Sequence, residues 1–230
     1  MPTDFAQADG INIEEIAQRL QSERPADRMV ALAKLREVPD EIAAPLILPL
    51  VDDPNLQVRA FAVFAMGIKR SEASFPTLLR ILTTDPDYGI RADAAGALGY
   101  LEDPRALEPL VRTFYEDVEW LVRFSAAVAL GNLKDNRAFD ALVKALESPD
   151  ALMHQAVIAA FGEIGDPRCL PLILPYAQSE DWLVRQRLAQ ALGNLPSPKT
   201  IPALEYLSRD PHSNVAAAAL HSLRRLPPTE

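Results

Sequence analysis

A short pattern recurs every 31 or 32 residues along this chain of 230 residues. In each copy an apolar residue and an arginine are followed, eight residues after the arginine, by a glycine. The clearest copies are 58–67, 90–99, 122–131 and 184–193. Units this short cannot bury an apolar face alone, so neighbouring copies must stack on one another. The period therefore predicts a solenoid, with the arginine column at positions 28, 59, 91, 123 and 185 and with His154 and Ala216 in the two copies that depart.

Each copy predicts two helices. Within 103–133, Asp103 and Pro104 are typical of a helix start, apolar residues follow at helical spacing, and a second helix begins near Trp120. Asp-Pro or Ser-Pro pairs recur before the second helices and predict N-caps at Asp53, Asp85, Ser148 and Asp210. The fold class is an all-α solenoid of about seven helix pairs. We expect a disordered N-terminus over 1–11, one solenoid domain over 12–226 and a tail over 227–230.

The composition limits the partners. The chain has 32 acidic and 23 basic residues, a net charge of −9, which argues against nucleic acid and against an anionic membrane surface. One cysteine, Cys169, can form no internal disulfide, and we expect it to be a buried apolar residue. The first residues lack a signal-peptide pattern and no apolar run approaches about 20 residues. These features predict a cytoplasmic protein.

The segment Val122 to Gly131, with its Val-Arg start, its alanines and its Leu-Gly end, resembles a HEAT repeat. The short period is similar to the HEAT-like repeats of phycobilin lyases, a family that attaches bilin chromophores to phycobiliproteins and whose shorter relatives include phycobilisome degradation proteins. The resemblance covers nearly the whole chain. It implies a role in photosynthesis in a cyanobacterium, a phycobiliprotein partner and phycocyanobilin as a transient ligand, with no firmly bound cofactor.

The arginine column has two interpretations. Arginine matches the two propionates of a bilin, so Arg91, Arg123 and Arg185 are candidate ligand-binding residues. Alternatively, each arginine pairs with an acid of the adjoining turn, such as Asp53 or Asp85, and forms a structural ladder. The ladder is favoured, and His154 interrupts it.

An aromatic column lies three residues before the arginine column, at Tyr88, Trp120 and Trp182. These rings either stack on a tetrapyrrole or a protein partner along one edge of a concave face, or staple the turn between the helices. Just before them stand carboxylates that either bind pyrrole N–H groups or a basic partner, or simply favour a helix start. This acidic column is Asp87, Glu119, Asp150 and Asp181.

No nucleophile–base constellation, metal-ligand spacing or phosphate loop is found in the sequence. If proton transfer occurs at a bilin linkage, Glu119, Asp181 and His154 are the candidates. The favoured function is a binding scaffold acting on phycobilisome proteins or their bilins, in detachment, turnover or chaperoning. The alternatives are a general protein adaptor without chromophore chemistry and a lyase that attaches phycocyanobilin. A DNA-repair enzyme is disfavoured by the acidic charge, and the oligomeric state is left open.

Overall fold

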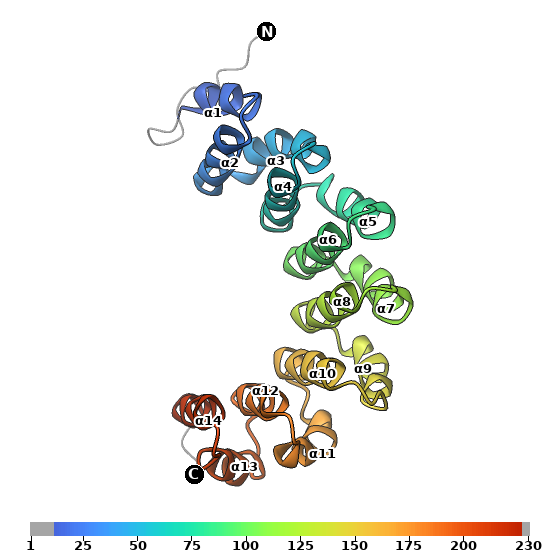
Figure 1. Ribbon diagram of the computed structural model, residues 1–230, viewed down its shortest axis with the longest axis vertical. Coiled ribbons are helices and arrows are strands. Elements are labelled where there is room, and N and C mark those ends of the chain that lie inside the picture. Colours follow the sequence, from blue (N-terminus) through green and yellow to red (C-terminus); the bar gives the residue numbers. More distant parts are fainter. Residues whose placement is uncertain (1–11, 227–230) are drawn as a thin grey trace. The chain divides into compact units, whose positions relative to one another are not determined.

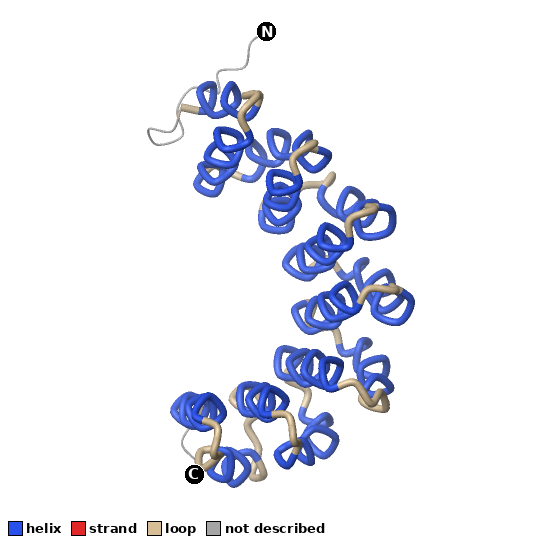
Figure 2. Tube along the Cα trace, in the orientation of Figure 1, coloured by secondary structure: helices blue, strands red, loops and turns tan. Residues whose placement is uncertain are grey.

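The computed structural model describes residues 12–226, which form helices joined by short turns and contain no strand (Figures 1 and 2). The all-α class is confirmed. The segments 1–11 and 227–230, predicted to be disordered and a tail, lie outside the described residues. The chain divides into two compact units at residue 106, and each is described by itself. The expectation of one continuous domain stays a prediction.

Unit 1, residues 12–106, holds three helix pairs with short 3-10 segments between them. Its helices are α1 (Ile13–Leu20), α2 (Pro25–Lys34), η1 (Leu35–Glu37), α3 (Asp40–Ile47), η2 (Leu48–Asp52), α4 (Leu56–Ile68), α5 (Ser74–Thr84), α6 (Tyr88–Leu101) and η3 (Pro104–Ala106).

Unit 2, residues 107–226, continues the same alternation. Its helices are α7 (Leu107–Glu116), α8 (Trp120–Asn132), η4 (Asn136–Ala138), α9 (Phe139–Ala145), α10 (Ala151–Ile164), η5 (Pro167–Cys169), α11 (Leu170–Ile173), η6 (Leu174–Gln178), α12 (Trp182–Leu192), α13 (Thr200–Leu207) and α14 (Ser213–Arg225).

The second helix of each pair packs on the second helix of the next. In unit 1 α2 contacts α4 and α4 contacts α6; in unit 2 the order is α8, α10, α12 and α14. The first helix of each pair packs on its own second helix, as α5 does on α6 and α7 on α8. Each second helix is thus held on two or three sides, which explains why its buried residues surround much of its circumference, as in α6 and α10.

The recurring glycine is required by close helix packing. A Cβ atom added at Gly67 of α4 would lie 2.7 Å from the Cα atom of Ala97 in α6. One added at Gly131 of α8 would lie 2.6 Å from the Cα atom of Ala160 in α10. Real Cβ atoms essentially never approach that closely, so the glycine lets neighbouring second helices touch backbone to backbone.

The predicted caps of the second helices were wrong by two residues. The N-caps are Asn55, Asp87, Asp150 and His212, and the first three accept a hydrogen bond from an amide of the first turn. The aspartate two residues earlier instead closes the turn: Asp53 Oδ1 accepts from the Asn55 amide at 2.8 Å. Its carboxylate also pairs with Arg28 of the arginine column, as the ladder interpretation of the sequence expects.

Candidate binding site

The arginine column forms a ladder of ion pairs where an acid follows 25 or 26 residues later. In unit 1 Arg28 Nε and Nη2 each donate to the Asp53 carboxylate at 2.8 Å. Both side chains are nearly buried, at 9% and 5% exposed. In unit 2 Arg185 donates from Nε and Nη2 to Asp210 at 2.7 and 3.0 Å. The Arg185 hydrogen bonds hold the pKa of the Asp210 carboxyl below its usual range. These ion pairs are the ones that the ladder interpretation of the arginine column predicts.

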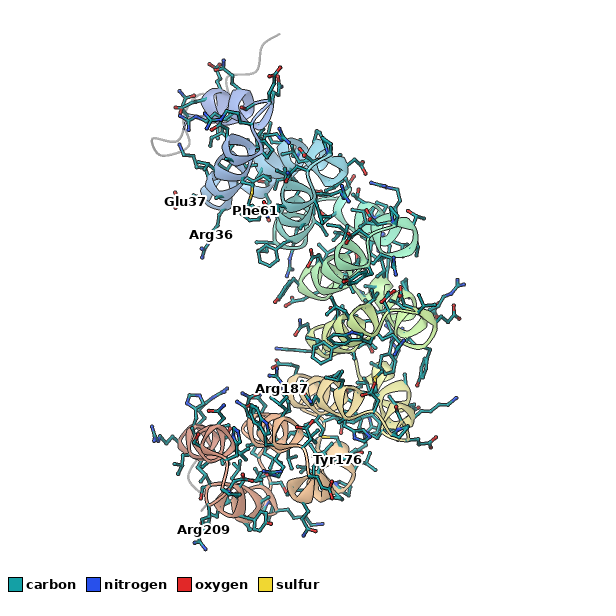
Figure 3. All side chains as sticks on the ribbon, viewed as in Figure 1. Arg36, Glu37, Phe61, Tyr176, Arg187 and Arg209 are labelled. Atoms are coloured by element: carbon teal, nitrogen blue, oxygen red, sulfur yellow. The ribbon has the colours of Figure 1, made fainter. Side chains whose placement is uncertain are left out.

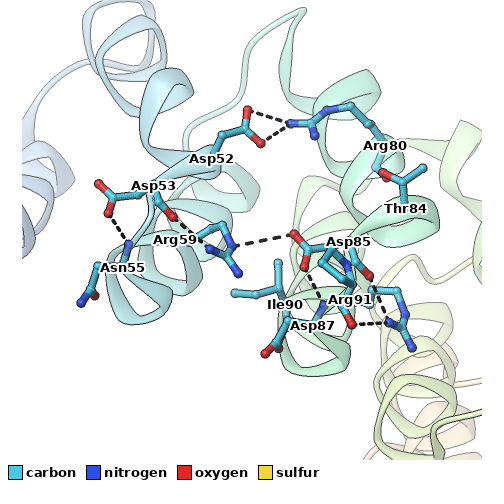
Figure 4. A network of polar contacts seen from close by, with 11 residues as sticks. Asp52, Asp53, Asn55, Arg59, Arg80, Thr84, Asp85, Asp87, Ile90 and Arg91 are labelled. Atoms are coloured by element: carbon cyan, nitrogen blue, oxygen red, sulfur yellow. Dashed lines mark hydrogen bonds and ion pairs between the residues drawn. The ribbon is translucent and has the colours of Figure 1, made fainter.

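A second contact fixes each arginine independently of the acid. The Nη1 atom donates to the carbonyl six residues earlier: Arg59 to Asp53 at 2.9 Å and Arg91 to Asp85 at 3.0 Å, as Figure 4 shows. Arg59 also lies 3.8 Å from the Asp85 carboxylate, a looser pair than that of Arg28. The arginine side chain is therefore anchored on the backbone of the turn before its own helix.

We call each position of the arginine column, together with the turn 25 or 26 residues later, a ladder step; a step is closed where the turn supplies an acid and open where it does not. Two successive steps of unit 2 are open. Arg123 keeps the backbone anchor, with Nη1 donating to the Asp117 carbonyl at 3.0 Å. Where the other steps have an aspartate, however, the chain has Ser148. At the next step His154 replaces the arginine and Ser179 the acid. Within residues 12–226 the Arg123 side chain makes no ion pair.

The three aromatic residues of the predicted column do not share one environment. Tyr88 and Trp120 begin α6 and α8 and are about half exposed, at 51% and 49%. Trp120 meets the ring of Phe124, on its own helix, edge to face. Trp182 begins α12 and lies parallel to His212, with ring centroids 3.8 Å apart and 9° between planes. One face of Trp182 is thus covered, as the stapling alternative expects, while Trp120 keeps a solvent-accessible surface.

The acidic column serves mainly as helix caps. Asp87 accepts from the Ile90 amide at 3.0 Å and Asp150 from the Leu152 amide at 2.9 Å. Asp181 caps α12 and also accepts from Gln155 Nε2 at 3.1 Å, which ties α10 to α12. Glu119 precedes α8 without a capping bond from its side chain.

The three proton-transfer candidates are not joined to one another. Glu119, His154 and Asp181 belong to three different helix starts, and no hydrogen bond among the described residues connects any two of them. The ring of His154 lies 4.8 Å from the ring of Tyr176, and its Nε2 atom is buried without a partner in the part of the chain described. Nor does that part contain a group of three or more His, Cys, Asp or Glu residues placed to hold a metal.

An exposed apolar patch on α4 and α6 of unit 1 was missed by the sequence analysis. We define this apolar patch as Phe61, Phe64, Ile68 and Tyr100; the last three are 43%, 47% and 51% exposed. The rings of Phe64 and Tyr100 meet edge to face with centroids 6.1 Å apart. A contiguous exposed group of this kind marks an interaction surface more often than single exposed apolar residues do.

A cleft of about 540 Å³ adjoins the apolar patch. It runs between α2 and α4, and its walls are Leu32, Ala33, Leu35, Arg36, Ile47, Phe61, Phe64, Ala65, Ile68 and Lys69. Figure 3 shows Arg36 and Phe61 on the same side of unit 1. Lys69 is already bound to the Val38 carbonyl at 2.6 Å and to Asp40 at 3.2 Å. The volume falls in the range of small-molecule sites, and the lining is mostly apolar.

The sequence did contain a signal for the apolar patch. Nine residues after the arginine column stand Ile68 and Tyr100 in unit 1, where unit 2 has Asn132, Glu163 and Asn194. Large apolar residues in a column that is otherwise polar, on a helix whose other faces are packed, predict an exposed contact surface.

Cys169 is buried, as expected, at 0% exposure. Burial, together with the nearby Asp166 carboxylate, raises the pKa of its thiol to about 12, so the thiolate is scarcely populated at neutral pH. This is the environment of a packing residue and not of a nucleophile. Each helix within 12–226 is too short or too polar to traverse a bilayer.

Models of HEAT repeats match residues 13–98, 75–159 and 140–224, and the chain therefore belongs to the HEAT-repeat family. Among solved structures it is similar to a chain in the complex of CpcE and CpcF of phycocyanin lyase from Nostoc sp. PCC7120. The identity is 27%, the TM-score is 0.64, and the match covers 78% of this chain and 75% of that chain. The protein is thus a HEAT-repeat protein, and its structure is similar to that of a chain of a phycocyanin lyase complex, as the sequence resemblance predicted.

Two more distant structures share the fold alone. The YibA protein of Escherichia coli is 17% identical, with a TM-score of 0.57 over 94% of this chain and 93% of that one. Yeast importin-β is 14% identical, with a TM-score of 0.63 over 93% of this chain and 35% of that one. No curated protein sequence matches the chain.

Proposed function

We propose that this protein binds phycobiliprotein subunits or their bilin chromophores and acts in bilin detachment, turnover or chaperoning. The observation that carries the proposal is the cleft of unit 1 with the exposed rings of Phe64 and Tyr100 beside it. A conjugated, largely apolar ligand stacks well on such rings. The similarity to a chain of the phycocyanin lyase complex supports bilins as the ligand class. The proposal includes a phycobilisome-associated role in the cytoplasm of a cyanobacterium.

The test is a spectroscopic titration of the purified protein with phycocyanobilin and then with intact phycocyanin subunits. We expect the bilin absorption band to sharpen or shift to the red as the chromophore is immobilised. The double variant Phe64→Ala/Tyr100→Ala should weaken binding about tenfold or more, because exposed aromatic anchors commonly contribute most of an interface's affinity. Tyr206→Ala is the matched control, since Tyr206 is 60% exposed but lies in unit 2. Equal affinities for all three proteins would remove the cleft from the proposal.

The apolar patch also fits a second function, that of a protein adaptor without chromophore chemistry. Phe64, Ile68 and Tyr100 have the character of anchors for apolar side chains of a partner. Under this alternative, apo and chromophore-bearing phycocyanin subunits bind equally well and free bilin gives no spectral change. Attachment of phycocyanobilin to an apo subunit, read as a new covalent bilin band on a denaturing gel, would instead establish a lyase.

A further inference from the structure

Arg123 keeps the backbone anchor that the arginines of the closed ladder steps have. Its Nη1 atom donates to the Asp117 carbonyl at 3.0 Å and to the Val118 carbonyl at 3.2 Å. The equivalent bonds of Arg28 and Arg185 reach the Ser22 and Ser179 carbonyls at 2.7 and 2.6 Å. The guanidinium is therefore preorganised before any acid binds it, which lowers the entropic cost of gaining a carboxylate partner.

Among residues 12–226, the rest of the Arg123 guanidinium has no acceptor. In Arg28 and Arg185, Nε and Nη2 both donate to an aspartate. In Arg123, neither atom forms a hydrogen bond to a described residue. Ser148 replaces the aspartate only in closing the turn, because its Oγ atom accepts from the Asp150 amide at 3.2 Å. The turn is therefore closed in the usual way, and the only difference at this step is that Nε and Nη2 of Arg123 have no carboxylate to bind.

The surroundings of Arg123 suit a planar ligand with a carboxylate. A small hollow of about 10 Å³ opens beside it, with Trp120, Arg123, Phe124, Asp150, Leu152 and Met153 as its walls. Space of that size admits roughly one water-sized polar group, such as one carboxylate oxygen. The half-exposed Trp120 ring then offers an apolar surface to the body of the ligand.

The neighbouring Asp150 carboxylate does not prevent a ligand carboxylate from binding close to it. Its Oδ1 atom is bound by the Leu152 amide at the start of α10, where the helix dipole favours negative charge. In unit 1 the chain itself places two carboxylates in this relation, since Asp85 stands two residues before the cap Asp87 and lies 3.8 Å from Arg59.

We propose that the open ladder step, Arg123 opposite Ser148, is a carboxylate-binding subsite that takes one propionate of a bilin, in the position that Asp53 and Asp210 occupy at the closed steps. The inference rests on the proposed function for the class of ligand, a bilin; the subsite belongs to unit 2 and is a binding site additional to the cleft of unit 1. The inference favours Arg123 over Arg28, Arg59 and Arg185 as a ligand-binding residue, because those three already pair with carboxylates of the chain.

The test compares phycocyanobilin with its dimethyl ester, in which both propionates are neutral. Trp182→Phe leaves Trp120 as the single tryptophan of the chain, so quenching of its fluorescence reports binding near the subsite. In this background we expect the free acid to bind about tenfold more tightly than the ester. Ser148→Asp supplies the missing carboxylate and should lower the affinity for the free acid about tenfold while leaving the ester unchanged. Arg123→Gln should do the same.

Ser179→Asp is the matched control. It adds the same charge one repeat later, opposite His154 and not opposite an arginine, and should change neither affinity. Equal affinity for acid and ester, or an equal loss in the two aspartate variants, would overturn the subsite and leave the proposed function standing. No binding of either compound would overturn both. If Ser148→Asp weakened only the binding of an apo phycocyanin subunit, the carboxylate would come from a protein, and the assignment to a bilin would be wrong.

Discussion

The ladder steps at Arg28 and at Arg123 differ in one residue of the partner turn. Arg28 in unit 1 is 9% exposed and grips Asp53 with two hydrogen bonds of 2.8 Å. Arg123 in unit 2 has the same backbone anchor, and Ser148 stands at the sequence position of the acid. The comparison separates two tasks. The turn is closed by any side chain that accepts from the amide two residues later, as both Asp53 and Ser148 do.

The negative charge of the carboxylate, by contrast, serves to neutralise the arginine. A buried pair needs that neutralisation, since an unpaired buried charge is costly. Arg123 is only partly buried, so water can solvate its charge and the need for a counter-charge is smaller. The period of the repeats thus sets the position of every arginine, while the residue in the partner turn determines whether the guanidinium pairs with an acid of the chain, as Arg185 does with Asp210, or is left open, as at Arg123.

The closed step should be the most sensitive to loss of its acid. Asp53→Ala leaves the Arg28 guanidinium nearly buried without a counter-charge, and we expect the free energy of unfolding to fall by about 3–5 kcal/mol. Urea denaturation followed by circular dichroism measures this. Asp52→Ala is the control: it removes the exposed pair with Arg80, of 3.0 Å, and should cost about 0–1 kcal/mol. Similar losses for the two variants would show that burial does not distinguish the ladder from surface pairs.

Packing is expected to be equally tight at closed and open steps. Gly67→Ala in unit 1 and Gly131→Ala in unit 2 each force a Cβ atom against the backbone of the next helix, and each should cost about 1–3 kcal/mol. Gly96→Ala, inside α6 with nothing within 4 Å of the added atom, should instead stabilise by about 0.5–1 kcal/mol. A negligible effect of Gly131→Ala alone would mean that the open step is loosely packed, and that its missing acid reflects poor packing and not a ligand.

The fold could be predicted from the sequence because the same residues, the glycines among them, make the same packing contacts in successive repeats. The helix pairs, the stacking and the pairing of Arg28 and Arg185 with later acids follow from residues that recur in register. The caps were misplaced by two residues because aspartate and asparagine suit both positions of the turn, and composition does not distinguish an N-cap from a turn-closing acceptor.

The candidate site was less predictable, because it lies where copies differ. The sequence analysis treated Trp120 and Trp182 as equivalent, although only Trp182 is stacked on a histidine. It also passed over Phe64 and Tyr100, whose contact depends on the relative positions of α4 and α6. Which member of a column faces solvent is a property of packing, and a single sequence shows it only as a departure from the column's usual residue.

The pH dependence of the closed step in unit 2 offers a smaller test. The Arg185 hydrogen bonds lower the pKa of Asp210 in the folded protein, so its contribution to stability is complete above the ordinary carboxyl pKa of about 4 and is lost as the pH falls through the lowered value. Asp210→Asn should therefore be less stable than wild type at neutral pH, and the difference should shrink below about pH 4. Urea unfolding of both proteins from neutral pH to about pH 3 measures the difference; a gap that stays constant would mean that the carboxylate charge is not what stabilises this step.

Closing the open step should have the smallest effect on stability. Ser148→Asp can keep the bond to the Asp150 amide, as Asp53 keeps its bond to the Asn55 amide, and adds an ion pair with Arg123. Because Arg123 is partly exposed, we expect a gain of only about 0.5–1 kcal/mol in the free energy of unfolding. Ser179→Asp, whose aligned position 25 residues earlier is His154 and not an arginine, should give about half of that or less. A loss of more than about 1 kcal/mol for Ser148→Asp would show that the carboxylate position of this step is blocked, and the difference between the two ladder steps would then be one of shape and not of a single missing acid.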